Sequence, residues 1–188
     1  MKFLKTTAAL AALTLPFVAM TPAHAAQLYL GANVGQTFEP SASVSGFDIP
    51  LSDDLTYGVS AGAADLIGPF RVEAELRKIN TDVLGLIDAN STILFANAFL
   101  DLNQDGKIQP YLGAGIGLAK SEVNVFGFTA NADSTAWQAV GGVAFKASNK
   151  LILDASVRHI DLGDLDFGLG SDVEVTTNAF TVGVRLLV

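Results

Sequence analysis

The stretch DLNQDGKIQPYL carries the residue types and the spacing of a calcium-binding loop. Asp101, Asn103 and Asp105 stand where a twelve-residue EF-hand loop places oxygen ligands, and Gly106 stands at its sharp turn. The twelfth position should be a bidentate glutamate, but it is Leu112, and the flanks are typical of strands rather than helices. We therefore predict a tight turn, because Asn, Asp and Gly tolerate positive φ, and we interpret the three ligand-like residues as a weak metal decoy.

The rest of the chain offers little for catalysis. Its two histidines are His24 and His159, and it contains no cysteine. Spacing supports no Ser-His-Asp grouping, no histidine closely followed by a serine, no P-loop, no dinucleotide fingerprint and no zinc site. We predict that the protein is not an enzyme and has no cofactor, and we expect His159 to face outward near the outer rim.

The N-terminus is typical of a secretory signal. Lys2 and Lys5 form a positive start, about 15 uncharged and mostly apolar residues follow, and AHA ending at Ala25 is a small-x-small cleavage site. We predict a cleaved signal peptide over residues 1–25 and one mature domain over residues 26–188. The signal segment contains two lysines and no acid, so the net charge falls from −8 for the chain to −10 for the mature domain.

Composition then narrows the class of protein. Half of the residues are hydrophobic and only 16% are charged, where about a quarter is usual for a soluble domain. Beyond the signal, no apolar run approaches the roughly 18 residues of a spanning helix. The negative net charge argues against nucleic acid as a partner. An exported, apolar, cysteine-free chain of this kind is best explained by a transmembrane β-barrel, which distributes its apolar residues over alternate positions.

Apolar and polar residues do alternate through the remaining chain. In FRVEAELRK, four apolar residues on one face alternate with four charged residues on the other. QLYLGANVGQTF, LILDASVRH and NAFTVGVRLLV show the same period of two, which is the period of a strand and not of a helix. The pattern predicts strands that each have one apolar and one polar face.

We predict eight strands, each near the roughly 9–11 residues of a tilted membrane-spanning strand. The connections alternate between short turns and long loops, the longest being EPSASVSGFDIPLSDDL and LGDLDFGLGSDVEV. This asymmetry is typical of an outer-membrane barrel with both chain ends in the periplasm. Because the last strand ends at Val188, we expect no attached periplasmic domain. The predicted strands are residues 27–38, 56–65, 69–79, 90–101, 108–120, 134–146, 150–161 and 176–188.

This topology also predicts two lipid-facing aromatic girdles, one at each water interface. The outer girdle would contain Phe38, Tyr57, Trp137 and Phe180, and the inner girdle Phe70 and Phe145.

PYLGAGIGLA, residues 110–119, resembles the proline-tyrosine-aliphatic-glycine strand of the opacity-type, OmpA-like outer-membrane β-barrel family. The resemblance extends to the signal peptide, to NAFLDL and WQAVGGVAF, and to the arginine of DASVRHIDL. The resemblance implies an all-β fold, namely an eight-stranded antiparallel up-and-down transmembrane β-barrel. It also implies that the protein lies in the outer membrane of a Gram-negative bacterium. Two departures stand out: Val188 replaces the terminal aromatic residue that the assembly machinery recognises, and Val157 and His159 replace aromatic residues beside the arginine.

The polar faces would crowd charges into the barrel. An eight-stranded barrel has an interior only wide enough for side chains, so the glycines of LGAGIGL and of other strands would leave room for bulkier residues. An unpaired buried charge is costly, so we expect these arginines and carboxylates to form ion pairs, and the paired side chains would plug the lumen. The alternative is a narrow polar channel through the barrel. The predicted lumen network contains Arg71, Glu73, Glu75, Arg77, Asp154, Arg158 and Arg185.

Several functions fit such a barrel. We predict a structural or surface-interaction protein with long extracellular loops as its recognition surface, and a small porin for small solutes is the alternative. Expected partners are outer-membrane lipid and lipopolysaccharide, the barrel-assembly machinery, and a host or surface ligand of the loops. A soluble, lipocalin-like binder would need the opposite polarity, with its charged faces outside, and would leave the girdles unexplained.

Overall fold

The computed structural model describes residues 26–44, 47–50, 55–83, 87–125, 128–166 and 172–188; the predicted signal peptide lies outside them. Within these ranges the chain forms nine antiparallel strands. The same residues contain no helix that is long and apolar enough to cross a membrane. The strands are β1 (Gln27–Val44), β2 (Phe47–Pro50), β3 (Leu55–Ile67), β4 (Phe70–Val83), β5 (Ile87–Asp101), β6 (Ile108–Val125), β7 (Phe128–Lys146), β8 (Leu151–Asp166) and β9 (Asp172–Leu187).

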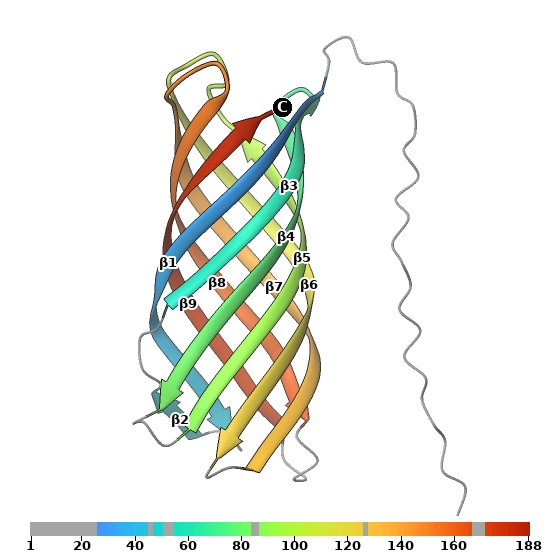
Figure 1. Ribbon diagram of the computed structural model, residues 1–188, viewed down its shortest axis with the longest axis vertical. Coiled ribbons are helices and arrows are strands. Elements are labelled where there is room, and N and C mark those ends of the chain that lie inside the picture. The colour runs from blue at the N-terminus through green and yellow to red at the C-terminus, as the bar shows by residue number, and fades with distance from the viewer. Residues whose placement is uncertain (1–25, 45–46, 51–54, 84–86, 126–127, 167–171) are drawn as a thin grey trace, which may run out of the picture.

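Eight of these strands close a barrel, which confirms the predicted fold. From β3 to β9, each strand pairs with the next one in the sequence. Strand β1 pairs with both β3 and β9, so these eight strands form a closed sheet without an open edge (Figure 1). The short strand β2 is an addition that pairs with residues 41–44 of β1. The start of β1, the end of β9 and the short connections lie together at one rim, here called the short-turn end. The opposite rim is called the hairpin end.

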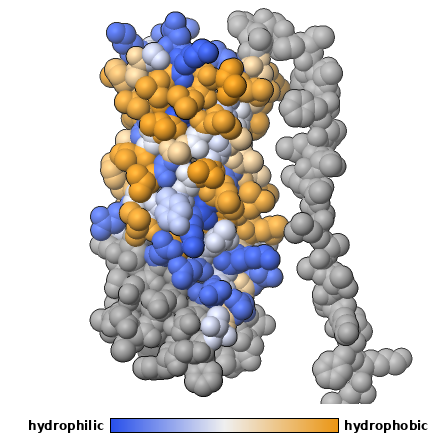
Figure 2. Space-filling view, viewed as in Figure 1, coloured by the Kyte–Doolittle hydropathy of each residue, from blue (hydrophilic) through white to orange (hydrophobic). Residues whose placement is uncertain are grey.

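The period-two alternation places charge inside and apolar residues outside. On β4, Arg71, Glu73 and Glu75 are buried, whereas Val72 and Leu76 are 45% and 49% exposed. Figure 2 shows the result on one face, where a broad hydrophobic region lies below a hydrophilic upper rim, and hydrophilic residues gather again toward the hairpin end. This polarity is that of a membrane barrel and the reverse of a soluble one.

The hairpin end corrects the sequence prediction of long loops. The strands match their predicted ends at the short-turn end within two residues, but most continue several residues further at the other end. Residues 39–44 belong to β1, and residues 162–166 and 172–175 extend β8 and β9. The alternation marks only the part of a strand that meets lipid; backbone pairing continues into water, where no apolar face is needed.

The predicted aromatic girdle residues point away from the lumen. Tyr57, Trp137 and Phe180 toward the hairpin end, and Phe70 and Phe145 at the short-turn end, are between 42% and 54% exposed. Phe38 is half-buried on the same outward face of β1.

Candidate functional site: the barrel lumen

All seven residues of the predicted lumen network lie on the interior side of the barrel. Six are buried and Asp154 is half-buried. The structure adds an eighth charge, because the carboxylate of Asp101 points into the lumen and binds Arg71. Among the residues that the structure describes, four arginines and four carboxylates therefore share this interior network and balance in charge.

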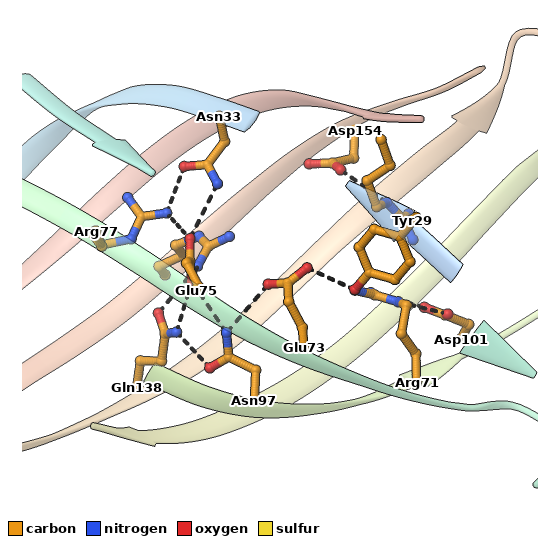
Figure 3. Close-up of polar contacts among 12 residues, drawn as sticks. Tyr29, Asn33, Arg71, Glu73, Glu75, Arg77, Asn97, Asp101, Gln138 and Asp154 are labelled. Carbon is orange, nitrogen blue, oxygen red and sulfur yellow. Dashed lines mark hydrogen bonds and ion pairs between the residues drawn. The ribbon is translucent and has the colours of Figure 1, made fainter. Parts of the chain in front are cut away.

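Glu75 is the centre of the network and is fully buried (Figure 3). Its Oε1 lies 2.6 Å from Nη2 of Arg77, and its Oε2 lies 2.9 Å from Nη1 of Arg158. Arg77 and Arg158 come from strands on opposite sides of the barrel, β4 and β8, so one carboxylate joins the two walls. Such charge-assisted bonds compensate the cost of burying three ions.

Amide side chains complete the coordination of Glu75 (Figure 3). Asn33 donates to Oε1 at 3.1 Å, and Asn97 and Gln138 each donate to Oε2 at 3.2 Å. Gln138 also donates to Asn97 at 2.8 Å, which links β7 to β5. The charges are thus held in one connected polar network that crosses the lumen.

A second cluster lies nearer the short-turn end and is built around Arg71. Its Nε and Nη2 donate to the two carboxylate oxygens of Asp101 at 2.9 and 3.1 Å, a bidentate pair. Nη1 donates to the hydroxyl of Tyr29, which in turn donates to Glu73 at 2.7 Å. The guanidinium also lies 3.9 Å from the ring centroid of Phe99, close enough for a cation–π contact.

Arg185 and Asp154 form a further ion pair, with Nε and Oδ2 3.3 Å apart. The Arg185 guanidinium lies 5.8 Å from the ring centroids of both Tyr29 and Tyr111. The two tyrosines therefore pack between the cations of this end and limit the open space around them.

An apolar cluster lies inside the barrel on the hairpin side of Glu75, along the wall formed by β4 to β8. It consists of inward-facing residues of β4 to β8 that pack against one another, and Ile93 and Ile160 at its centre are fully buried. This cluster was not predicted. Its members are Ile79, Ile93, Phe95, Ala119, Ala136, Ile160 and Leu162.

Two small cavities lie inside the described part of the barrel. One of about 20 Å³ lies among Arg71, Glu73, Asp154, Arg158 and Arg185, with room for one or two water molecules. A larger one of about 70 Å³ lies at the short-turn end and is lined by residues of the rim as well as by the second cluster.

The glycines of β6 leave room for side chains of β5, and not for the charged residues of the lumen network as we expected. A Cβ at Gly115 would overlap the amide oxygen of Asn97, and a Cβ at Gly113 would overlap the ring of Phe99. The interior face of β6 is therefore covered by side chains of β5 rather than by the charged residues. Gly58 does follow the prediction, since a Cβ there would lie 2.9 Å from Oε1 of Glu75.

The calcium-like stretch forms a turn between β5 and β6. Asn103 has a φ of +55°, its side chain donates to the carbonyl of Ile108 at 2.9 Å, and Gly106 donates to the carbonyl of Asn103. Because Asp101 binds Arg71 inside the barrel, its carboxylate cannot join Asp105 around an ion in the turn. Among the described residues, no group of three or more His, Cys, Asp and Glu is arranged to hold a metal.

His159 lies on the outward face of β8, as predicted. Its Nδ1 is 3.0 Å from Oδ1 of Asn178, and its ring centroid is 5.3 Å from that of Trp137. Its side chain lies on the opposite face of β8 from that of Arg158, outside the lumen, and has the surroundings of an interfacial residue.

The model of the outer membrane protein beta-barrel domain family matches residues 7–186. The chain belongs to this family. Members of this family are typically not enzymes, and the eight strands that close the barrel are the transmembrane strands of this chain. No curated protein matches the chain.

Solved structures show the same fold. Neisserial surface protein A, NspA, is 21% identical over 85% of this chain and 96% of its own, with a TM-score of 0.69. OprG of Pseudomonas aeruginosa is 12% identical over 87% of this chain and 96% of its own, with a TM-score of 0.57. Ail, the attachment invasion locus protein of Yersinia pestis, is 17% identical over 84% of this chain and 98% of its own, with a TM-score of 0.52.

Proposed function

We propose that this outer-membrane barrel is a non-conducting anchor that presents its hairpins at the cell surface for recognition. Residues 1–25 would be removed on export, and the hairpin end would face the outside, as the long connections of such barrels do. The observation that carries the proposal is the filled lumen, in which a charge network and an apolar cluster follow one another along the axis.

The filled lumen argues against the small-porin alternative. An ion crossing the barrel would have to separate Glu75 from Arg77 or Arg158 and then pass the apolar cluster around Ile93 and Ile160. Breaking such buried pairs costs several kcal/mol, and the apolar cluster offers no polar group to replace them.

The hairpin end supports a role in recognition. Pairing of β6 with β7 continues for five residue pairs beyond Lys120 and Asp133, up to Val125 and Phe128, about 17 Å along the strands. The backbone register also places acidic residues opposite one another, Asp164 beside Glu174 and Asp166 beside Asp172. Hairpins of this charge favour a partner with a cationic surface.

This charge distinguishes the chain from one of its structural neighbours. Ail has been crystallised with the heparin analogue sucrose octasulfate, a polyanion, and the Ail in that complex is 17% identical over 86% of this chain. Acidic hairpins would repel such a ligand. We therefore propose surface recognition for this chain as well, but of a ligand of opposite charge.

Conductance across a planar bilayer tests the sealed lumen. We expect the refolded mature protein to insert without producing steady unitary currents, and we expect Arg158→Ala to lower heat stability more than it raises conductance. Steady currents from the unmutated protein would contradict the proposal in favour of a porin. A large conductance increase in Arg158→Ala with unchanged heat stability would do the same.

Binding to immobilised poly-lysine and to immobilised heparin tests the hairpins. The barrel in nanodiscs should bind poly-lysine at low salt, release it as salt rises, and leave heparin unbound. A variant with Asp164→Asn and Glu174→Gln should bind poly-lysine more weakly, whereas Asp105→Asn at the short-turn end should bind as before. Equal binding by both variants, or a preference for heparin, would argue against the acidic hairpins as the recognition surface.

A further inference from the structure

The distribution of cations over the barrel is uneven. Of the eleven lysines and arginines in the sequence, two precede residue 26 and four are the lumen arginines. Lys107, Lys146 and Lys150 lie at the short-turn end. The remaining two, Lys78 and Lys120, both lie toward the hairpin end, where acidic residues otherwise predominate.

These two lysines share one row across the outside of the barrel. Lys78 of β4 is opposite Thr92 of β5, and Thr92 is opposite Lys120 of β6. All three side chains alternate with buried neighbours and so point away from the lumen. Because two strand spacings separate the lysines, their backbones lie about 10 Å apart, with the Thr92 hydroxyl between them.

The row coincides with the edge of the apolar belt. Two residues nearer the short-turn end, the same three strands present Leu76, Leu94 and Leu118, which are 49%, 55% and 63% exposed. Two residues nearer the hairpin end, β5 and β6 present Asn90 and Glu122. The lysines therefore stand at the level where lipid-facing residues give way to polar ones.

Tyr57 supports this placement of the boundary. It is opposite Lys78 in the register of β3 and β4 and is 42% exposed on the outward face. Tyrosine concentrates at membrane–water interfaces because its ring is apolar and its hydroxyl is polar.

We propose that Lys78, Thr92 and Lys120 bind a phosphate group of an outer-leaflet phosphorylated glycolipid of the lipopolysaccharide type, with its acyl chains against Leu76, Leu94 and Leu118. The proposal rests on the proposed location and orientation of the barrel in the outer membrane. Two cations above three exposed leucines match a ligand that has anionic phosphate above hydrocarbon. They also offset the repulsion between such a lipid and the acidic hairpins.

Neutralisation of nearby acids is the competing role for these lysines. Asp133 is opposite Lys120 on β7, and Glu122 follows two residues later on the same face. Among the described residues, neither lysine takes part in an ion pair. The ammonium groups are therefore not committed to these carboxylates in the structure.

The test uses the mature protein folded into phosphatidylcholine vesicles that contain bis-phosphorylated lipid A, or the same lipid A without its phosphates. Retained lipid is measured after the protein is extracted and purified. We expect about fivefold less phosphorylated lipid retained for each lysine replaced, in Lys78→Gln, Lys120→Gln and the double variant. Lys107→Gln with Lys150→Gln, at the opposite rim, should retain as much as the unmutated protein.

Further variants and ligands decide between the two roles. Asp133→Asn should increase retention if Lys120 serves the lipid, and Lys78→Arg with Lys120→Arg should preserve it. Free inorganic phosphate added to plain vesicles should not bind measurably, since it lacks the acyl chains. The proposal is overturned if dephosphorylated lipid A is retained equally, or if the double glutamine variant keeps heat-modifiable folding and full retention. The conductance and hairpin-binding tests of the proposed function involve neither lysine. Failure of the proposed function can therefore be distinguished from failure of this lipid-binding proposal.

Discussion

Replacement of Glu75 by glutamine should destabilise the barrel more than any other single loss of a carboxylate. The substitution keeps the volume of the side chain but removes the counter-charge of both Arg77, at 2.6 Å, and Arg158, at 2.9 Å. Both arginines stay buried, because they are anchored on opposite walls. Removing one partner of a buried pair typically costs about 3–5 kcal/mol, and we expect a loss of unfolding free energy in that range for Glu75→Gln.

Urea unfolding in vesicles or detergent, followed by the fluorescence of Trp137, measures this effect because the chain has a single tryptophan. Glu73→Gln should cost less, since Arg71 lies 3.6 Å from Glu73 and keeps its bidentate pair with Asp101. Glu122→Gln, on the exposed outer face, is the matched control and should have little effect. A change below about 1 kcal/mol for Glu75→Gln would be typical of a water-exposed pair and would refute a sealed network.

Three further substitutions test other parts of the barrel by the same unfolding assay. Ile93→Ala should cost about 2–5 kcal/mol because it opens a cavity in the apolar cluster, and equal stability would mean that the cluster does not pack tightly. Gly115→Ala should destabilise, since its Cβ would displace Asn97 from Glu75 and Gln138, whereas Gly141→Ala should be tolerated because its Cβ would approach nothing closer than 3.5 Å. Ile116→Arg should cost about 2–4 kcal/mol, because this residue is 73% exposed within the apolar belt. No effect of Ile116→Arg would contradict contact with lipid.

The barrel itself was predictable because lipid imposes a period-two signal on every spanning strand. FRVEAELRK and its counterparts carry that signal, and turn residues end the strands at the short-turn end. At the hairpin end the prediction stopped too early, because residues such as those of TANAD, 129–133, continue the strand beyond the lipid-facing part and need no alternation. Backbone pairing holds these strands together without a pattern in the side chains.

The lumen was predictable in part. The charges of β4, β8 and β9 alternate with apolar residues and so reveal their face, but Asp101 resembled a turn ligand. Its separation by four and two residues from Asn97 and Phe99 places all three on one face, which is the signal that could have identified it. The apolar cluster carried no such signal, because Ile93 and Phe95 are as apolar as their lipid-facing neighbours. Only the register, which pairs Ile93 with Arg77, shows that they point inward.

Cysteine accessibility along β5 tests most directly the claim of an apolar exterior around a sealed, charged interior. The chain has no cysteine, so single substitutions at residues 93 to 98 give an unambiguous readout with a charged, water-soluble thiol reagent and a lipid-soluble one. We predict that residues 94, 96 and 98 react only with the lipid-soluble reagent and that residues 93, 95 and 97 react with neither until the barrel unfolds. Reaction of residues 93, 95 and 97 with the water-soluble reagent in the folded barrel would reveal an open aqueous lumen and contradict the account.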